Sequence, residues 1–323
     1  MSLAPAQAAA SAAGAAPARY RLLALDLDGT VLDPSGRVPA ENREAIARAR
    51  AAGITVVVCT GRGLIECRHI LEELGLTEAC PGQQKLGGAA AVVAGGALIA
   101  DAASGRTLHR FAMHADLASA AVDRVLSAGH AALVLKDPTA AGYDYLCVTG
   151  PDDHPLDPVT RWWFASMNVR VRMARTLAHD DHPEHTVRVG ACGLSGTLAA
   201  LKRDLAERFS DRAVIHAFPA VVAPDSAKKT SDGQTLHILE LFDRAAHKWS
   251  AVTQLASMLG LTPAQIAAIG DEINDVTMIA GAGLGIAMGN AIAPVRQAAR
   301  RTTRSNAEAG VAYAIDRILA SEW

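Results

Sequence analysis

The chain has 323 residues, half of them hydrophobic and a fifth charged, so it is long enough for two globular domains. A formal net charge of -2 excludes the strongly basic surface typical of proteins that bind nucleic acid or anionic membranes. No apolar run is long enough to span a bilayer. The five cysteines lack the paired spacing of a disulfide framework or a zinc knuckle, which predicts reduced thiols and a cytoplasmic protein.

Strand and helix patterns alternate in the first third of the chain. Residues 1–19 are rich in Ala and are expected to form a disordered tail. Apolar or β-branched runs predict strands at 21–27, 54–59 and 91–99, and helical spacing predicts helices at 40–51 and 64–75. This alternation predicts an α/β fold with a parallel, doubly wound sheet.

The middle of the chain predicts a smaller α/β domain with an antiparallel sheet. Strands are expected at 107–111, 132–136, 145–148, 185–191, 213–218 and 236–241, with helices at 116–128 and 194–208. Turns are expected in the Pro- and Asp-rich stretch 149–160. Trp162 and Trp163 follow it and either cover a site or pack within this domain. The His- and Asp-rich segment 179–185 shows no recognised metal-ligand spacing and favours a polar loop.

The first pattern resumes after Lys248. Helices are expected at 249–259, 275–280 and 293–300, and strands at 266–269 and 284–288. The larger domain is therefore discontinuous. We expect a core domain from residues 20–103 and 236–323, into which a cap domain of residues 104–235 is inserted.

Polar residues follow three of the predicted core strands. Asp26 and Asp28 end the first strand, Thr60 the second, and Asp271 follows a later one. The carboxyl ends of parallel strands meet at one edge of a sheet, which is where open α/β sheets bind their ligands. Because two neighbouring buried carboxylates need a proton or a cation to offset their charge, a charged site is predicted there.

Four segments, in order, resemble the motifs of the haloacid dehalogenase superfamily of phosphohydrolases: Asp26-Leu27-Asp28-Gly29-Thr30, Thr60-Gly61-Arg62, Lys248 and Gly270-Asp271-x-x-Asn274-Asp275. The long insert before Lys248 resembles the Cof-type subgroup, which carries a large α/β cap on a Rossmann-like core. The resemblance implies a Mg²⁺-dependent phosphatase that hydrolyses a small phosphorylated metabolite, such as a sugar phosphate, through an aspartyl-phosphate.

The same resemblance implies a role for each motif residue. Asp26 would be the nucleophile and Asp28 the general acid and base, a division of labour that two adjacent carboxylates with different pKa values can support. The expected Mg²⁺ ligands are Asp26, the main-chain carbonyl of Asp28, and Asp271. The expected phosphate-binding residues are Thr60, Gly61, Lys248 and Asn274. Asp275 and Arg62 would lie around these groups and hold the lysine, the phosphate or the substrate.

Two departures from the family pattern leave other functions open. Trp249 follows the lysine where a small residue is usual, and Gly95 stands where related enzymes commonly have Asn. A binding module that has lost turnover is therefore one alternative. Phosphoryl transfer of the phosphomannomutase type is another, whereas Asp28 argues against a dehalogenase.

Overall fold

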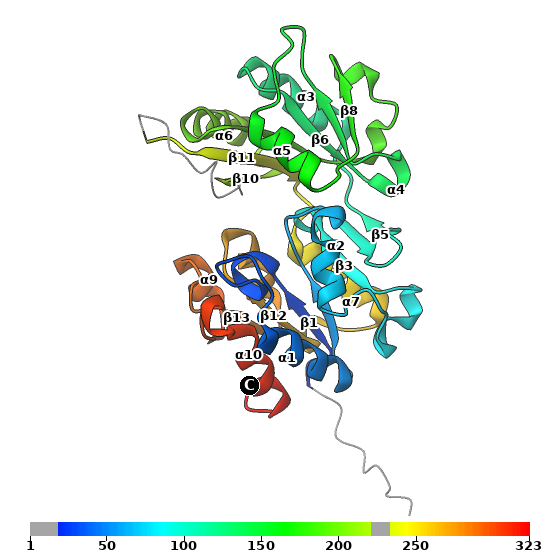
Figure 1. Ribbon diagram of the computed structural model, residues 1–323, viewed down its shortest axis with the longest axis vertical. Helices are drawn as coiled ribbons and strands as arrows, with labels where there is room; N and C mark the ends of the chain where they lie inside the picture. Colours follow the sequence, from blue (N-terminus) through cyan, green and yellow to red (C-terminus); the bar gives the residue numbers. More distant parts are fainter. Residues whose placement is uncertain (1–18, 221–232) are drawn as a thin grey trace, which may run out of the picture.

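The structure, a computed structural model, describes residues 19–220 and 233–323. A core lobe and a cap lobe lie one above the other, and the chain passes between them after β5 and again after β11 (Figure 1). The predicted disordered tail falls, except for residue 19, outside the described residues.

The core is built on a five-stranded sheet in the order β14-β13-β12-β1-β2. Every neighbouring pair is parallel, which confirms the predicted sheet type. Its strands are β1 (Leu22–Leu25), β2 (Thr55–Val58), β12 (Ile266–Gly270), β13 (Leu284–Ala287) and β14 (Arg301–Thr302). The first four are buried along their whole length, as expected for a sheet that helices cover on both faces.

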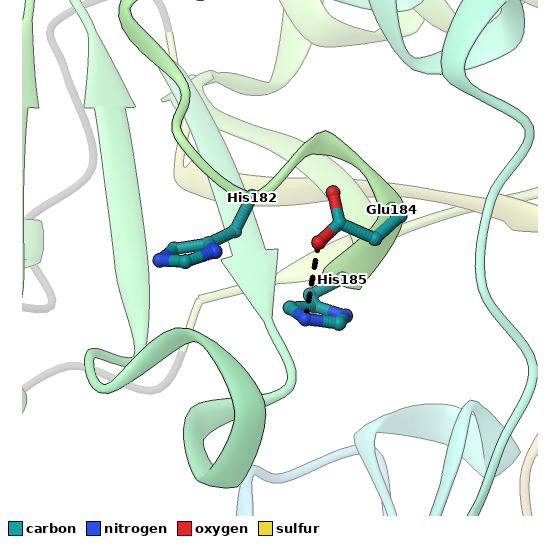
Figure 2. A group of neighbouring side chains, drawn as sticks. All are labelled: His182, Glu184 and His185. Atoms are coloured by element: carbon teal, nitrogen blue, oxygen red, sulfur yellow. Dashed lines mark ion pairs between the residues drawn. The ribbon is translucent and has the colours of Figure 1, made fainter.

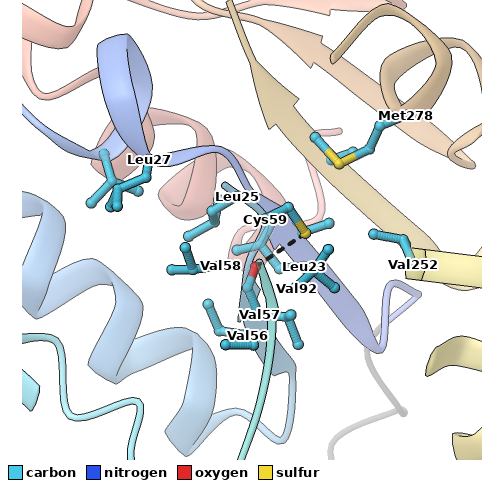
Figure 3. Close-up of a cluster of buried hydrophobic side chains, with 14 of the residues drawn as sticks. Leu23, Leu25, Leu27, Val56, Val57, Val58, Cys59, Val92, Val252 and Met278 are labelled. Atoms are coloured by element: carbon cyan, nitrogen blue, oxygen red, sulfur yellow. Dashed lines mark hydrogen bonds between the residues drawn. The ribbon is translucent and has the colours of Figure 1, made fainter. Parts of the chain in front are cut away.

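Helices cover this sheet and supply much of the core. They are α1 (Ala40–Ala51), α2 (Leu64–Glu73), α7 (Lys248–Leu259), α8 (Val276–Gly281), α9 (Ala293–Ala298) and α10 (Gly310–Leu319). Figure 3 shows Val252 and Met278 meeting strand residues such as Leu23 and Val92, with the Cys59 thiol directed at the Val57 carbonyl. Among the described helices, none is both long enough and apolar enough to cross a membrane.

A three-stranded antiparallel sheet leads from the core toward the cap. It contains β3 (Ala90–Val93), β4 (Leu98–Asp101) and β5 (Thr107–Arg110), and Cys59 bridges to Val92 in parallel. The predicted domain boundary after residue 103 is wrong in this respect, because β5 pairs with β4 rather than with a strand of the cap.

The cap is a six-stranded sheet in the order β10-β11-β9-β6-β7-β8 with helices packed on it. The strands are β6 (Ala132–Lys136), β7 (Tyr145–Val148), β8 (Val171–Ala174), β9 (Thr186–Leu194), β10 (Ala213–Pro219) and β11 (Leu236–Asp243). The helices are α3 (Ala115–Ser127), α4 (Pro138–Ala141), α5 (Pro158–Ser166) and α6 (Ser195–Phe209). All pairs except β7 with β8 are antiparallel, close to the prediction.

Two features of the cap differ from the sequence prediction. The boundary at residue 235 assigned β11 to the core, but β11 pairs with β9 and β10 in the cap sheet. β8 and α5 were not predicted, because both are short and lack the long periodic pattern that makes an element predictable. In Figure 1, α5 lies on the side of the cap that faces the core.

Candidate functional site

The predicted residues at the carboxyl edge of the core sheet lie together. Asp26 comes directly after β1, and its backbone N–H donates to the Ile269 carbonyl of β12 at 3.0 Å. Asp271 comes directly after β12, and its backbone N–H in turn bonds to Asp275 at 3.0 Å. Parallel neighbouring strands thus bring residues more than 240 positions apart to one edge, as predicted.

Lys248 joins two of these carboxylates. Its Nζ donates to Asp26 Oδ1 at 2.5 Å and to Asp275 Oδ1 at 2.7 Å, and all three side chains are almost fully buried. The other Asp275 oxygen accepts from the backbone N–H groups of Asp271 and Glu272 at 3.0 and 3.1 Å. Asp275 therefore holds the lysine beside Asp26 and also fixes the turn that carries Asp271.

Burial and crowding perturb the pKa values of the whole group. Burial, and then the neighbouring charge of Asp275, raise the pKa of Asp26 well above its usual range, although Lys248 opposes them. Burial alone would lower the pKa of Lys248, but Asp26 and Asp275 outweigh it and raise the value. Burial also raises the pKa of Asp271 to about 6. The group thus carries more negative charge than one lysine offsets.

Side chains around Asp271 fix its orientation. The Thr30 hydroxyl donates to Asp271 Oδ1 at 2.8 Å, and Asn290 Nδ2 lies 3.3 Å from Oδ2. Gly29 has a φ of +78°, and a Cβ there would lie 2.3 Å from Asp271 Oδ2, so this position requires glycine on both counts. Asn290 lies shortly after β13, so it follows a strand of the core sheet as the other residues of the site do.

A divalent cation fits this group. Carboxylate oxygens of Asp26, Asp271 and Asp275 lie within 4.8 Å of one another, and no other cation besides Lys248 pairs with them among the described residues. An all-oxygen donor set is what Mg²⁺ prefers, and a cation would relieve the raised pKa values. The predicted ligand set differs by one residue, because it includes Asp28 through its main-chain carbonyl and not Asp275.

Asp28 pairs with Arg62 and not with the lysine of this group. The guanidinium contacts both carboxylate oxygens of Asp28, with Nε 2.9 Å from Oδ2. The Asp28 side chain is 50% exposed, whereas that of Asp26 is 7% exposed. β1 ends at Leu25, so both aspartates lie beyond the strand, and they have different partners although both line the same cavity. Two carboxylates in such unlike environments are suited to different tasks.

Thr60, Gly61 and Asn274 present polar groups near the carboxylates. The buried Thr60 hydroxyl accepts from the Arg62 backbone N–H at 3.1 Å, which leaves its hydrogen to donate to a ligand. Gly61 has open space where a side chain would be. Asn274 Oδ1 is buried without a hydrogen-bond partner among the described residues. These positions are those predicted for phosphate contacts.

The packing of the chain accommodates both departures from the family pattern. A Cβ on Gly281 would lie 2.3 Å from Trp249 Cε2, so the missing side chain at 281 makes room for the indole. A Cβ on Gly95, which has a φ of +67°, would lie 2.8 Å from Phe242 Cζ. Trp249 and Gly95 therefore each match a neighbouring residue, and neither displaces Lys248 from its two carboxylates.

A cavity of about 390 Å³ extends from the carboxylates to the cap. Its core wall includes Asp26, Asp28, Gly61, Arg62, Asp271 and Asn274. Its cap wall includes Leu133, Val159, Trp162, Trp163, Met167 and Ile238. Both Trp162 and Trp163 line this cavity, and Trp163 also packs within the cap, so the two possibilities left open for these residues are compatible.

A buried polar network joins the cap wall to the core. Arg188 of β9 contacts Glu240 of β11 and the hydroxyl of Tyr145 of β7, and it lies 3.5 Å from the Gly61 carbonyl. Glu66 of α2 is also buried in the cavity wall, and burial raises its pKa to about 7 although Arg188 opposes this. This network was not predicted, since its signal in the sequence is limited to Arg188 and Glu240 within two largely apolar strands.

The polar cap loop predicted around 179–185 lies away from this cavity. Figure 2 shows His182, Glu184 and His185 grouped there, with His185 Nε2 3.2 Å from Glu184 Oε1. None of the three lines the cavity. The buried Lys136 anchors the loop through Asp180 and the His182 carbonyl, so the prediction of a polar loop is confirmed.

Comparisons with known proteins agree with this geometry. The family model described as haloacid dehalogenase-like hydrolase matches residues 23–315. The chain is 29% identical over 315 residues to the 5-amino-6-(5-phospho-D-ribitylamino)uracil phosphatase YwtE of Bacillus subtilis, covering 94% of this chain and 99% of that protein. It is 28% identical over 273 residues to the HMP-PP phosphatase of Citrobacter koseri, covering 84% and 85%.

A solved structure shows the same arrangement of the whole chain. A haloacid dehalogenase-like hydrolase from Bacteroides thetaiotaomicron matches with a TM-score of 0.69 and 25% sequence identity. The match covers 93% of this chain and 99% of the other, so it includes both the core and the cap.

Proposed function

The chain belongs to the haloacid dehalogenase-like hydrolases of the Cof type, and on that premise we propose that it is a Mg²⁺-dependent phosphatase acting on a small phosphorylated metabolite. The observation that carries this proposal is that Asp26 and Asp271 lie together on the core wall of the cavity, with Lys248 bonded to Asp26 behind it. One relative is named for a phosphorylated uracil derivative and another as an HMP-PP phosphatase, which supports a small phosphorylated substrate. The sugar phosphate that the resemblance implied and the cytoplasmic location remain predictions.

In the first step, Asp26 attacks the phosphorus atom and the ester P–O bond breaks. Lys248 holds Asp26 and offsets negative charge as the two anions approach. Phosphate oxygens would accept hydrogen bonds from the Thr60 hydroxyl, the Gly61 backbone N–H and the Asn274 side-chain NH₂ group. Asp28 gives its proton to the departing alkoxide, so the alcohol leaves neutral and the phosphoryl group stays on Asp26.

In the second step, water attacks the phosphorus atom of the aspartyl-phosphate. Asp28, now a carboxylate, takes a proton from this water, and phosphate leaves while Asp26 returns to its free form. Arg62 holds Asp28 through both oxygens and thereby orients the group that moves the proton. Mg²⁺ held by Asp26 and Asp271 would neutralise the charge that the phosphate brings to these carboxylates.

Release of inorganic phosphate from a panel of phosphate monoesters, with and without Mg²⁺, tests this proposal. Asp26→Asn is expected to lower kcat by at least about 10³-fold, since it removes the nucleophile. Asp123→Asn on the exposed face of α3 is the control and should keep full activity. Undiminished Mg²⁺-dependent hydrolysis by Asp26→Asn would overturn the proposal.

The same assay separates the two alternatives. A phosphomannomutase-like enzyme would yield an isomerised sugar phosphate in place of inorganic phosphate. A binding module without turnover would be stabilised by Mg²⁺ and phosphate yet release no phosphate from any ester. Because the structure accommodates Trp249 and Gly95 without disturbing Lys248, neither departure favours loss of turnover.

A further inference from the structure

The cap wall of the cavity is apolar where it faces the catalytic carboxylates. Trp162 is 43% exposed and lines the cavity. Leu133, Val159 and Met167 line the same wall. A ligand that reaches from the phosphate position toward the cap therefore meets mainly carbon surface.

The polar groups of this wall already have partners. Arg188 contacts Glu240 and Tyr145, and the Thr160 hydroxyl and backbone N–H both bond to Asp157. In the described part of the chain, Asn274 is the one cavity-lining residue with a buried, unpartnered polar side-chain atom, and it lies on the core wall. A polyol against the cap would lose hydrogen bonds to water and find few replacements.

The aromatic side chains of this wall are held in place before any ligand binds. Trp163 packs edge-on against Tyr145, with ring centroids 5.9 Å apart, and its ring lies 5.2 Å from that of Phe164. Phe164 and Tyr145 are buried, so α5 is fixed to the cap sheet by rings that cannot easily move. Trp162, the preceding residue of α5, is consequently presented to the cavity on a rigid support.

We propose that the substrate is a phosphate monoester of a small alcohol that carries a flat aromatic or heteroaromatic ring, and that Trp162 contacts this ring. This inference rests on the phosphatase function proposed above and specifies an aromatic leaving group in place of the sugar that the family resemblance implies. A volume of about 390 Å³ is near the lower end of ordinary small-molecule cavities, which suits one ring rather than a dinucleotide. Aromatic faces favour other rings in offset or edge-on contact.

Benzyl phosphate and a hexose 6-phosphate provide the direct comparison, because both are esters of primary alcohols with similar leaving-group chemistry. The wild-type kcat/KM is expected to be at least about 10-fold higher for benzyl phosphate. Trp162→Ala should reduce that ratio about 10-fold, mainly through KM, and Trp162→Phe should restore part of it. Met173→Ala is the matched control, since Met173 is 54% exposed on β8 and does not line the cavity.

Binding measured without turnover distinguishes this inference from the proposed function. Benzylphosphonate, which cannot be hydrolysed, should bind the Mg²⁺-loaded protein about 10-fold more tightly than methylphosphonate, and Trp162→Ala should abolish the difference. If neither ester is hydrolysed but this preference holds, the phosphatase proposal fails and the aromatic site stands. A wild-type preference for the hexose ester, or equal losses for both ligands in Trp162→Ala, overturns the aromatic site.

Discussion

The two walls of the cavity differ in chemical character. The core wall presents Asp26, Asp28 and Asp271 with Lys248 behind them, whereas the cap wall presents mainly indole and aliphatic surface. On the cap wall of the cavity the charged side chains are Arg188 and Glu240, which pair with each other. The charged core wall suits the phosphate group, which all substrates of a phosphatase share. The apolar cap wall can therefore discriminate only between the remaining parts of the substrates.

The core and the cap also differ in what a buried lysine does. Each domain buries a lysine completely, Lys248 in the core and Lys136 in the cap. Lys248 pairs with two carboxylates at the cavity, while Lys136 pairs with Asp180 and with the Thr186 hydroxyl at 2.7 Å, away from it. Similar burial therefore serves catalysis in one domain and loop structure in the other, and the two lysines can be compared directly.

The largest effect is expected from Lys248→Met. Removing this lysine leaves Asp26 and Asp275 buried without a cation, which should lower the free energy of unfolding by about 3–5 kcal/mol. It also removes the charge beside the nucleophile, so kcat should fall about 10²–10³-fold. Urea unfolding and initial rates of phosphate release, both per folded protein, measure the two losses.

Lys136→Met is the counterpart in the cap. It should destabilise the protein by a comparable amount, because Asp180 is left buried without its partner, yet the folded fraction should keep its kcat. A similar loss of kcat in both variants would remove the distinction between the two domains.

The next effect concerns Glu66, which lies where the two walls meet. Burial raises its folded pKa from 4.5 to about 7, so the protonated form is favoured in the folded protein. The stability it contributes is complete below pH 4.5 and is lost as pH rises through about 7, a change of at most about 3 kcal/mol. Glu66→Gln should therefore flatten the decline in unfolding free energy between pH 5 and pH 8.

Glu72→Gln, on the exposed face of the same helix, is the control, and it should leave the decline of the unfolding free energy with pH unchanged. Because the cap supplies part of the burial around Glu66, the slope also reports contact between the two walls. If the unfolding free energy declined equally with pH in the wild type and in Glu66→Gln, the Glu66 carboxyl would not be buried as the structure describes.

The core site was predictable because backbone order determines it. Residues that directly follow neighbouring parallel strands must share an edge, so Asp26, Thr60 and Asp271 could be brought together from strand patterns alone. The orientation of each side chain was not predictable in the same way. Asp28 lies beyond β1, which ends at Leu25, and pairs with Arg62, a contact that the strand pattern does not encode.

The functional surface of the cap was less predictable because its contacts are made between distant strands. Arg188 and Glu240 meet only because β9 and β11 pair in a register that no local pattern encodes. The face of α5 that carries Trp162 is likewise determined by the packing of Trp163 on Tyr145, which belongs to the separate element β7. Sequence spacing could identify the tryptophans but not the direction in which they point.

A smaller effect tests how the core tolerates Trp249. Gly281→Ala would place a methyl group 2.3 Å from the indole, and we expect a loss of about 1–3 kcal/mol although Ala favours helix more than Gly. Thermal or urea unfolding measures it. In a Trp249→Leu background the penalty should disappear, and a penalty that persists there would show that Trp249 is not its cause.

The smallest effect is expected in the cap wall from Tyr145→Phe. The change removes the hydroxyl that accepts from Arg188 but keeps the ring packed on Trp163 and Phe164. Since Arg188 retains Glu240, the loss in unfolding free energy should be about 1 kcal/mol. A loss above about 3 kcal/mol would mean that polar contacts, not ring packing, hold this wall. A loss of only about 1 kcal/mol would mean that ring packing is the main support of the cap wall that carries Trp162. The core wall differs, because there the removal of one charged partner, Lys248, should cost several times more unfolding free energy.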